Sequence, residues 1–135
     1  MKYDLVPVEG SELFRVRALR DIPRFGVRAG DLGGLVGGEN NLSQTGDAWV
    51  FGDAQVSGSA YVYGDAQVFG NAWVSGSARV SGDAWVSDSA RVYGSARVYG
   101  DAWVYGNARV SGSARVYGNA RVCGCTQIDG SELVD

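Results

Sequence analysis

A six-residue repeat occupies most of this chain of 135 residues and restricts its fold more than any other feature. From Gly46 to Asp129 the sequence consists of fourteen consecutive hexads without an insertion, of which GDAWVF and GSARVS are typical. A helix is excluded, because a Gly every six residues would cost about 1 kcal/mol each and the Ala and Val of a hexad would not share one face. In a strand, Ala and Val are two residues apart and point to the same side. Each hexad therefore predicts a short strand followed by a corner at its Gly.

A second period, of eighteen residues, indicates how many corners close one coil. The residue that follows each Gly, taken at every third hexad, forms two nearly uniform columns. One column is Asp47, Asp65, Asp83, Asp101 and Asn119, and the other is Ser59, Ser77, Ser95, Ser113 and Ser131. Three hexads per coil predict an all-β fold, a triangular parallel β-solenoid of nearly five coils stacked at ~4.8 Å.

The interior of this solenoid is predicted from the same register. Val at every sixth position from Val50 to Val122, followed by Ile128, is expected to form stacked aliphatic columns, with Ala48 to Ala120 in the narrow space near the corners. One corner departs from the pattern, because Asp88 stands where the other hexads have Gly. Asp adopts the left-handed region at modest cost, so Asp88 is interpreted as a tolerated exception and not as a site.

The two ends of the chain do not follow the repeat. Residues 1–45 are predicted to form a cap on the solenoid of residues 46–135, the two together making one structural domain. Within the cap, Lys2 to Val8 and Glu12 to Leu19 alternate apolar and polar residues well enough to predict two strands of a hairpin.

The segment that leads from this hairpin into the first coil is rich in glycine. Asp31 to Gly38 (DLGGLVGG) predicts tight turns, and Leu35 and Leu42 are expected to fill the core of the first coil. At the other end Glu132 stands where the pattern places Ala, so regular packing is expected to stop there.

The hexad register resembles the left-handed parallel β-helix family of hexapeptide-repeat proteins. The left-handed sense is implied by that resemblance and not by the period. The segment from Leu13 to Val56 is similar in particular to uncharacterised phage and enterobacterial proteins of this class, which often carry acyltransferase labels. Because hexapeptide relatives commonly form side-by-side trimers, the resemblance also implies a homo-oligomer.

The residues of this chain argue against catalysis. Acyltransferases of the resembling family share a His base and a loop protruding from the coils, and zinc carbonic anhydrases on that fold use three His ligands. The chain has no His and no insertion among its hexads, and Cys123 has no His to activate it as a nucleophile. The expectation is therefore a non-enzyme with no catalytic, cofactor-binding or metal-binding residues; an acyltransferase-like enzyme is the less favoured alternative.

Charge and cysteine content limit the partners and the compartment. A net charge of −3 gives no bulk attraction to nucleic acid, and no apolar run approaches the ~20 residues of a membrane span. Cys123 and Cys125 are too few for a structural zinc site and too close for an unstrained disulfide. They are expected to be reduced, as in a cytoplasmic protein.

The outward positions of the hexads carry the candidate binding residues. Trp, Tyr and Arg are the residue types most enriched in protein–protein contacts, and here they stack at intervals of eighteen residues. The candidates for protein binding are Arg79, Arg97, Arg115, Tyr99, Tyr117, Trp49, Trp85, Trp103 and Tyr105. The three arginines are expected to dock an acidic surface, either on a partner protein or on the column of carboxylates of a second copy, which comprises Asp47, Asp65, Asp83 and Asp101.

Several interpretations of these faces remain open. A self-associating structural or scaffold protein and a phage protein that binds and modulates a host protein both fit an interaction module. Stacked aromatic and Arg side chains are also good strand formers and can constitute nothing more than a stable surface. The Ser column suggests ice binding, but it lies at a corner and not on a flat face.

Overall fold

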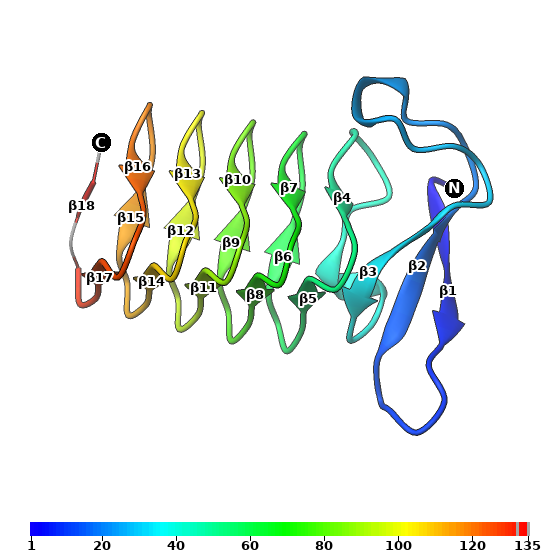
Figure 1. Cartoon of the computed structure of the whole chain (residues 1–135), viewed down its shortest axis with the longest axis horizontal. Coiled ribbons are helices and arrows are strands. Elements are labelled where there is room, and N and C mark those ends of the chain that lie inside the picture. The colour runs from blue at the N-terminus through cyan, green and yellow to red at the C-terminus, as the bar shows by residue number, and fades with distance from the viewer. Residues whose placement is uncertain (132, 135) are drawn as a thin grey trace.

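Short parallel strands stacked along one axis make up the body of the molecule (Figure 1). The structure is a computed structural model, and it describes residues 1–131 and 133–134. The strands line three sides of the stack, as expected for a triangular coil. The prediction of an all-β parallel solenoid is confirmed, and the stack has about six turns because the segment before the first hexad adds to it.

Each side of the coil is one sheet of two-residue strands. The first sheet contains β5 (Gln55–Val56), β8 (Trp73–Val74), β11 (Arg91–Val92), β14 (Arg109–Val110) and β17 (Gln127–Ile128). The second contains β4 (Trp49–Val50), β7 (Gln67–Val68), β10 (Trp85–Val86), β13 (Trp103–Val104) and β16 (Arg121–Val122). The third contains β6 (Tyr61–Val62), β9 (Arg79–Val80), β12 (Arg97–Val98), β15 (Arg115–Val116) and β18 (Leu133–Val134).

Residues eighteen apart lie one above the other, as the second period predicts. Trp85 pairs with Trp103 and Val86 with Val104 in the parallel register of β10 and β13. The coils are joined by backbone hydrogen bonds; the amide of Trp85, for example, donates to the carbonyl of Ala102 at 3.0 Å. Three hexads per coil are therefore confirmed.

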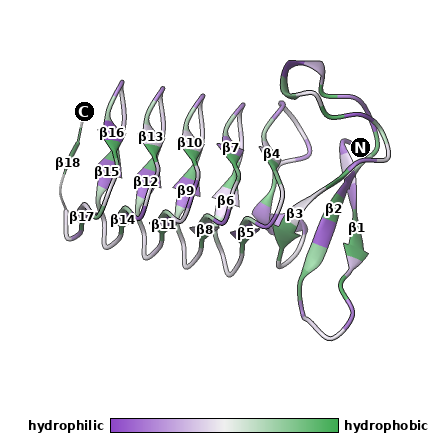
Figure 2. Cartoon of the chain, in the orientation of Figure 1, coloured by the Kyte–Doolittle hydropathy of each residue, from purple (hydrophilic) through white to green (hydrophobic). Residues whose placement is uncertain are grey.

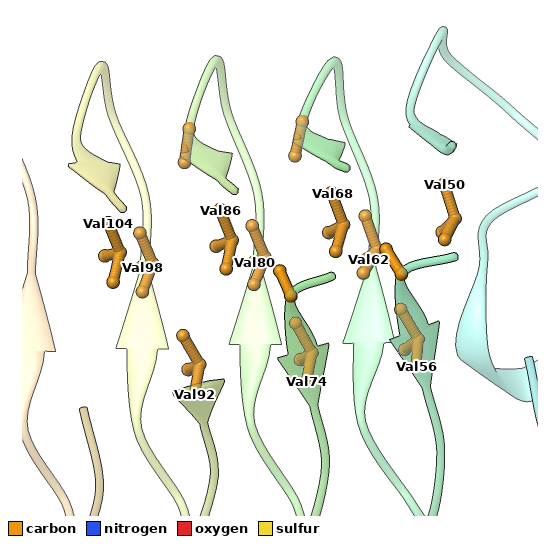
Figure 3. Close-up of a cluster of buried hydrophobic side chains, with 14 of the residues drawn as sticks. Val50, Val56, Val62, Val68, Val74, Val80, Val86, Val92, Val98 and Val104 are labelled. Carbon is orange, nitrogen blue, oxygen red and sulfur yellow. The ribbon is translucent and has the colours of Figure 1, made fainter. Parts of the chain in front are cut away.

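The core along the repeat is built from Val and Ala, with Ile128 in the last coil. The Val side chains point into the coil and form columns (Figure 3), and those from Val50 to Val116 are completely buried. Along each strand a buried apolar residue follows an outward residue of varying polarity (Figure 2). Ala and Val suffice because the cross-section of three two-residue strands leaves no room for larger side chains.

Asp88 adopts the left-handed backbone conformation that the glycine of the other hexads adopts. Its φ is 58°, and among the residues that the structure describes it is the only one other than glycine with a positive φ. The Asp88 carboxylate accepts a hydrogen bond from the amide of Gly106 at 3.1 Å, which ties its corner to the next coil. The expected tolerated exception is confirmed.

The N-terminal segment extends the first sheet. β1 (Tyr3–Pro7) and β2 (Phe14–Ala18) form the expected antiparallel hairpin. β3 (Leu32–Val36) pairs antiparallel with β2 and parallel with β5, so it joins the hairpin to the solenoid. Two short 3-10 helices, η1 (Pro23–Phe25) and η2 (Glu39–Asn41), lie in the connections on either side of β3.

Most of the glycine-rich segment from Asp31 to Gly38 is the strand β3 and not the predicted series of tight turns; only Gly37 and Gly38 lie in a bend. Its central glycines allow close packing of backbone against the first coil. A Cβ atom on Gly33 would lie 2.5 Å from the carbonyl oxygen of Val50, and one on Gly34 would overlap the Val50 side chain. The segment is therefore rich in glycine because no side chain fits between it and the first coil, and not because it forms turns.

The residues that fill the first coil differ in part from the expectation. Leu42 is fully buried and bridges to Val62, as predicted. Leu35 is only partly buried, because it pairs with the outward Gln55, and Val36 takes the interior place beside Val56. Glu132, where packing was expected to stop, lies outside the described residues.

Lys2 and Tyr3 are buried where the hairpin meets the first coil. The ammonium group of Lys2 donates hydrogen bonds to the carbonyl oxygens of Ala48 at 2.8 Å and Thr45 at 3.4 Å. Burial lowers the pKa of Lys2 from 10.5 to about 8, and nearby Arg20 acts in the same direction. The Tyr3 hydroxyl donates to the carbonyl of Leu42, and burial raises the Tyr3 pKa from 10.0 to about 12.

These two shifts predict that stability is highest near pH 10. Between pH 8 and 10.5 Lys2 binds more protons in the unfolded chain than in the native state, so stability rises with pH, by about 2 kcal/mol from pH 8 to 10. Above pH 10 the unfolded chain loses the Tyr3 proton first, and stability falls again. Urea midpoints measured across this range provide the test. Lys2→Met should abolish the rise, and Tyr3→Phe should reduce the fall; a parent-like profile in both variants would contradict the assignment.

Candidate protein-interaction site

The outward residues of the third sheet form the first candidate surface, called here the arginine face. Arg97 on β12 pairs in register with Arg79 on β9 and with Arg115 on β15, and all three side chains are exposed. A shallow groove of about 220 Å³ runs between them, lined by Tyr63, Arg79, Ser81, Arg97, Tyr99 and Arg115. The structure thus brings the three predicted arginines together on one side of the coil, on the strands β9, β12 and β15 that stack there (Figure 1).

Two predicted tyrosines complete the arginine face. The rings of Tyr99 and Tyr117 stack with centroids 5.4 Å apart and planes 10° from parallel. Both follow a strand of the third sheet and are partly buried. Together they provide a rigid aromatic surface beside the guanidinium groups.

The guanidinium groups of the arginine face have no ion-pair or cation–π partner within the part of the chain that the structure describes. The ion pairs there are made by Arg15, Arg17, Arg20 and Arg24 of the N-terminal segment. Two other arginines of the solenoid stack on tryptophan: Arg91 lies 4.7 Å from the Trp73 ring centroid and Arg121 4.6 Å from that of Trp103. Arg79, Arg97 and Arg115 therefore form an uncompensated row of positive charge.

Trp49 does not belong to any exposed surface, and its prediction as a binding residue is wrong. Its side chain is 1% exposed, and its ring meets Tyr3 edge-on with centroids 6.4 Å apart. The N-terminal hairpin and Gly33 cover the position, which would otherwise face outward in the register of the second sheet. Trp49 anchors the N-terminal segment on the first coil.

Trp85, Trp103 and Tyr105 lie on the second sheet, called here the tryptophan face. The rings of Trp85 and Trp103 stack with centroids 4.6 Å apart and planes 3° from parallel. Phe69 meets the Trp85 ring edge-on at 5.8 Å, and the Arg121 guanidinium covers the outer side of Trp103. Because the ring faces are occupied within the chain, this face offers a partner chiefly ring edges. Its geometry favours the interpretation as a stable surface.

A carboxylate column, defined as Asp65, Asp83 and Asp101, lines the corner between these two faces. It borders an open groove of about 640 Å³ whose other lining residues are Arg24, Phe25, Gln67, Trp85 and Trp103. The Arg24 guanidinium lies 3.1 Å from the Asp65 carboxylate and 3.7 Å from that of Asp83. Arg20 contacts Asp47 at 3.6 Å in the coil before. Sequence reasoning missed this contact, because no periodic signal places the N-terminal segment beside the coils.

The cysteines and carboxylates of the described residues form no cluster suited to binding a metal ion. No group of three or more His, Cys, Asp or Glu side chains is close enough there to hold a metal ion. Cys123 and Cys125 are both free thiols and exposed. The neighbouring Cys123 thiol raises the pKa of Tyr105. Among the residues described, no helix is both long and apolar enough to span a bilayer.

Comparison with known families supports the repeat. The YdcK Beta solenoid repeat matches five overlapping segments, residues 66–82, 78–94, 90–106, 102–117 and 114–128. The matched segments include the strands that carry the arginine face and the later part of the tryptophan face. No curated protein matches the chain.

Proposed function

We propose that this chain, whose coils are similar to the YdcK solenoid repeat, is a non-catalytic interaction module that binds an acidic protein surface through its arginine face. The module presents its row of charge on a preformed sheet, so little backbone order has to be gained on binding. The residues that make the contact in this proposal are Arg79, Arg97, Arg115, Tyr99 and Tyr117.

The observation that carries the proposal is the uncompensated row of guanidinium groups. Like charges stacked in register repel one another, and an acidic partner relieves that repulsion. Guanidinium forks bind carboxylates through two parallel hydrogen bonds, which gives the contact direction as well as energy. The stacked rings of Tyr99 and Tyr117 add rigid apolar area next to the charges.

The chemistry of the chain supports the non-catalytic part of the proposal. The sequence contains no His, so an imidazole base is not available for acyl transfer or hydrolysis. We place the module in the cytoplasm, because Cys123 and Cys125 are free thiols and a reducing compartment keeps them so.

Retention on immobilised poly-glutamate tests the proposal. The parent is expected to bind at low salt and to elute as salt rises, since exposed charge pairs are screened. Changing Arg79, Arg97 and Arg115 to Gln should weaken binding by about tenfold or more. Gln preserves the strand, because it occupies the same outward position at Gln67 and Gln127.

The matched control removes three positive charges from the other two sheets. Arg91, Arg109 and Arg121, each exposed, are changed to Gln together. This variant has the same net charge as the first and should retain binding close to that of the parent. Equal losses in the two variants would mean that only overall charge matters, and the arginine face would not be the binding site.

A further inference from the structure

The arginine face and the carboxylate column together form a surface that is complementary to itself, and we infer that a second copy of the chain binds there by a two-fold axis. The inference rests on the proposed function and identifies its acidic partner. In this arrangement the arginine face of each copy meets the carboxylate column of the other. Such a contact is isologous, since the same patch is used on both copies.

The two rows of charge belong to the same coils. In two successive coils an outward arginine is followed four residues later by the corner aspartate, Arg79 by Asp83 and Arg97 by Asp101, whereas Arg115 is followed by Asn119. The arginines lie on the third sheet and the aspartates on the corner that leads into the second sheet. The positive and negative rows therefore run side by side along the solenoid axis with the same rise per coil.

The rows do not neutralise each other within one chain. No ion pair within 4.0 Å joins Arg79 to Asp83 or Arg97 to Asp101 in the described part of the chain. Asp83 and Asp101 are exposed, and so are the three arginines. Both rows are thus open to a partner on the same side of the molecule.

Arg24 is an example of a guanidinium group that binds the carboxylate column. It comes from the N-terminal segment and not from the coils, yet its guanidinium contacts two successive carboxylates, 3.1 Å from Asp65 and 3.7 Å from Asp83. The spacing of the column therefore accommodates an arginine that reaches in from outside the repeat. The next coil presents Asp101, which has no ion-pair partner in the described residues.

The two-fold axis fixes which residues meet. For each arginine face to meet the carboxylate column of the other copy, the axis must run parallel to the solenoids, so that the two copies point the same way. Coils at the same height then face each other, and Arg79 lies opposite Asp83, and Arg97 opposite Asp101, of the second copy. Each of these two contacts occurs twice, once in each direction. An axis perpendicular to the solenoids would instead set arginine against arginine and aspartate against aspartate. The parallel arrangement is therefore favoured, and it uses Asp83 and Asp101, which are both exposed.

The spacing of the charges favours a second copy over an unrelated acidic protein. The arginines rise at ~4.8 Å per coil, the distance between neighbouring strands of a sheet. An extended acidic segment presents carboxylates on one side every two residues, at about 6.8 Å, and falls out of step within a few residues. Stacked parallel strands keep the shorter rise of ~4.8 Å. The carboxylate column of this chain has the same rise, because its residues are eighteen apart and lie one per coil.

Charge-reversal variants test the inference with the full chain. The acidic variant carries Arg79→Glu, Arg97→Glu and Arg115→Glu, and the basic variant carries Asp83→Lys and Asp101→Lys. The parent is expected to sediment as a dimer at about 20 mM salt and to dissociate toward about 0.5 M salt. Each variant alone should be monomeric, with affinity for itself reduced at least about a hundredfold. Arg109→Glu and Asp129→Lys, which change exposed charges on the first sheet and just after it, are controls that should dimerise like the parent.

Mixing the two variants gives the sharper result. At an equimolar ratio the acidic variant presents two negative rows and the basic variant mainly positive ones, so both halves of the two-fold contact become attractive again. The mixture should regain the dimer mass that neither variant has alone. Circular dichroism of each variant establishes that the strands are intact before mixing.

Three outcomes would overturn the inference: a parent that stays monomeric at low salt and high concentration, variants that dimerise like the parent, or folded variants that do not associate when mixed. Poly-glutamate retention separates this failure from that of the proposed function. A monomeric parent whose retention still depends on Arg79, Arg97 and Arg115 would reject the second copy and leave the acidic partner to another protein. Loss of that dependence would reject both.

Discussion

Replacing Val86 with Asp is expected to abolish folding of the solenoid. Val86 is completely buried and lies between Val68 and Val104 in the columns of the second sheet. The Val86→Asp change would place a carboxylate in an interior lined by Val and Ala, where it finds neither a cation nor a donor. An uncompensated charge in such a place costs several kcal/mol, a large part of the stability of a domain of this size.

The far-ultraviolet circular dichroism spectrum and the thermal transition of Val86→Asp provide the measurement. The matched control is Arg109→Asp, which introduces the same side chain at an exposed position just before the inward Val110. The control should melt within a few degrees of the parent, because surface substitutions change stability by about 0.5 kcal/mol. A Val86→Asp protein with a cooperative transition like that of the control would show that the register of the core is wrong.

The repeat made the body of the fold predictable from the sequence. Once residues eighteen apart are placed one above the other, the stacking of Trp85 on Trp103 and of Val86 on Val104 follows, and both are observed. The left-handed backbone at Asp88 followed in the same way from its place among the glycines. Each of these conclusions rests on the same rule, the pairing of residues eighteen apart, which every coil of the repeat repeats. A wrong register would therefore misplace residues in every coil and not in one alone.

The contacts of the N-terminal segment were not predictable in this way. Nothing in the hexads indicates that Tyr3 covers Trp49, or that Arg24 reaches Asp65 and Asp83. These contacts join residues far apart in the sequence, and each occurs once, so no period signals them. They decide which outward residues are available: Trp49 is removed from the candidate site, and part of the carboxylate column is already paired.

The availability of the solenoid arginines also depends on contacts that the sequence leaves open. All of them occupy the same position of a hexad, before the inward Val. In the structure Arg91 and Arg121 lie over Trp73 and Trp103, because each has a tryptophan one coil earlier on the same side. Arg97 and Arg115 have another arginine one coil earlier instead. A tryptophan eighteen residues earlier therefore accounts for both cation–π contacts of the solenoid arginines, whereas Arg79, which has Tyr61 there, makes none in the described part of the chain.

A corner glycine is expected to be nearly as important as a core valine. Gly94 has a φ of 67°, and a Cβ atom there would lie 2.8 Å from the amide nitrogen of Gly112 and 3.1 Å from its carbonyl oxygen. Gly94→Ala therefore combines the cost of a left-handed residue, about 1–2 kcal/mol, with that of forcing two coils apart, about 1–3 kcal/mol. We expect a loss of about 2–5 kcal/mol in the free energy of unfolding, measured by urea denaturation.

Gly124 provides the control that separates the two costs. Its φ is 64°, almost the same, but a Cβ atom there would meet nothing within 4 Å. Gly124→Ala should therefore lose only the backbone part, about 1–2 kcal/mol. The difference between the two variants then measures how closely the coils pack at their corners. Equal losses in the two variants would mean that glycine is required only for its left-handed backbone and not for lack of space between the coils. Asp88, which has the same backbone at a φ of 58°, would then be tolerated without extra space at its corner.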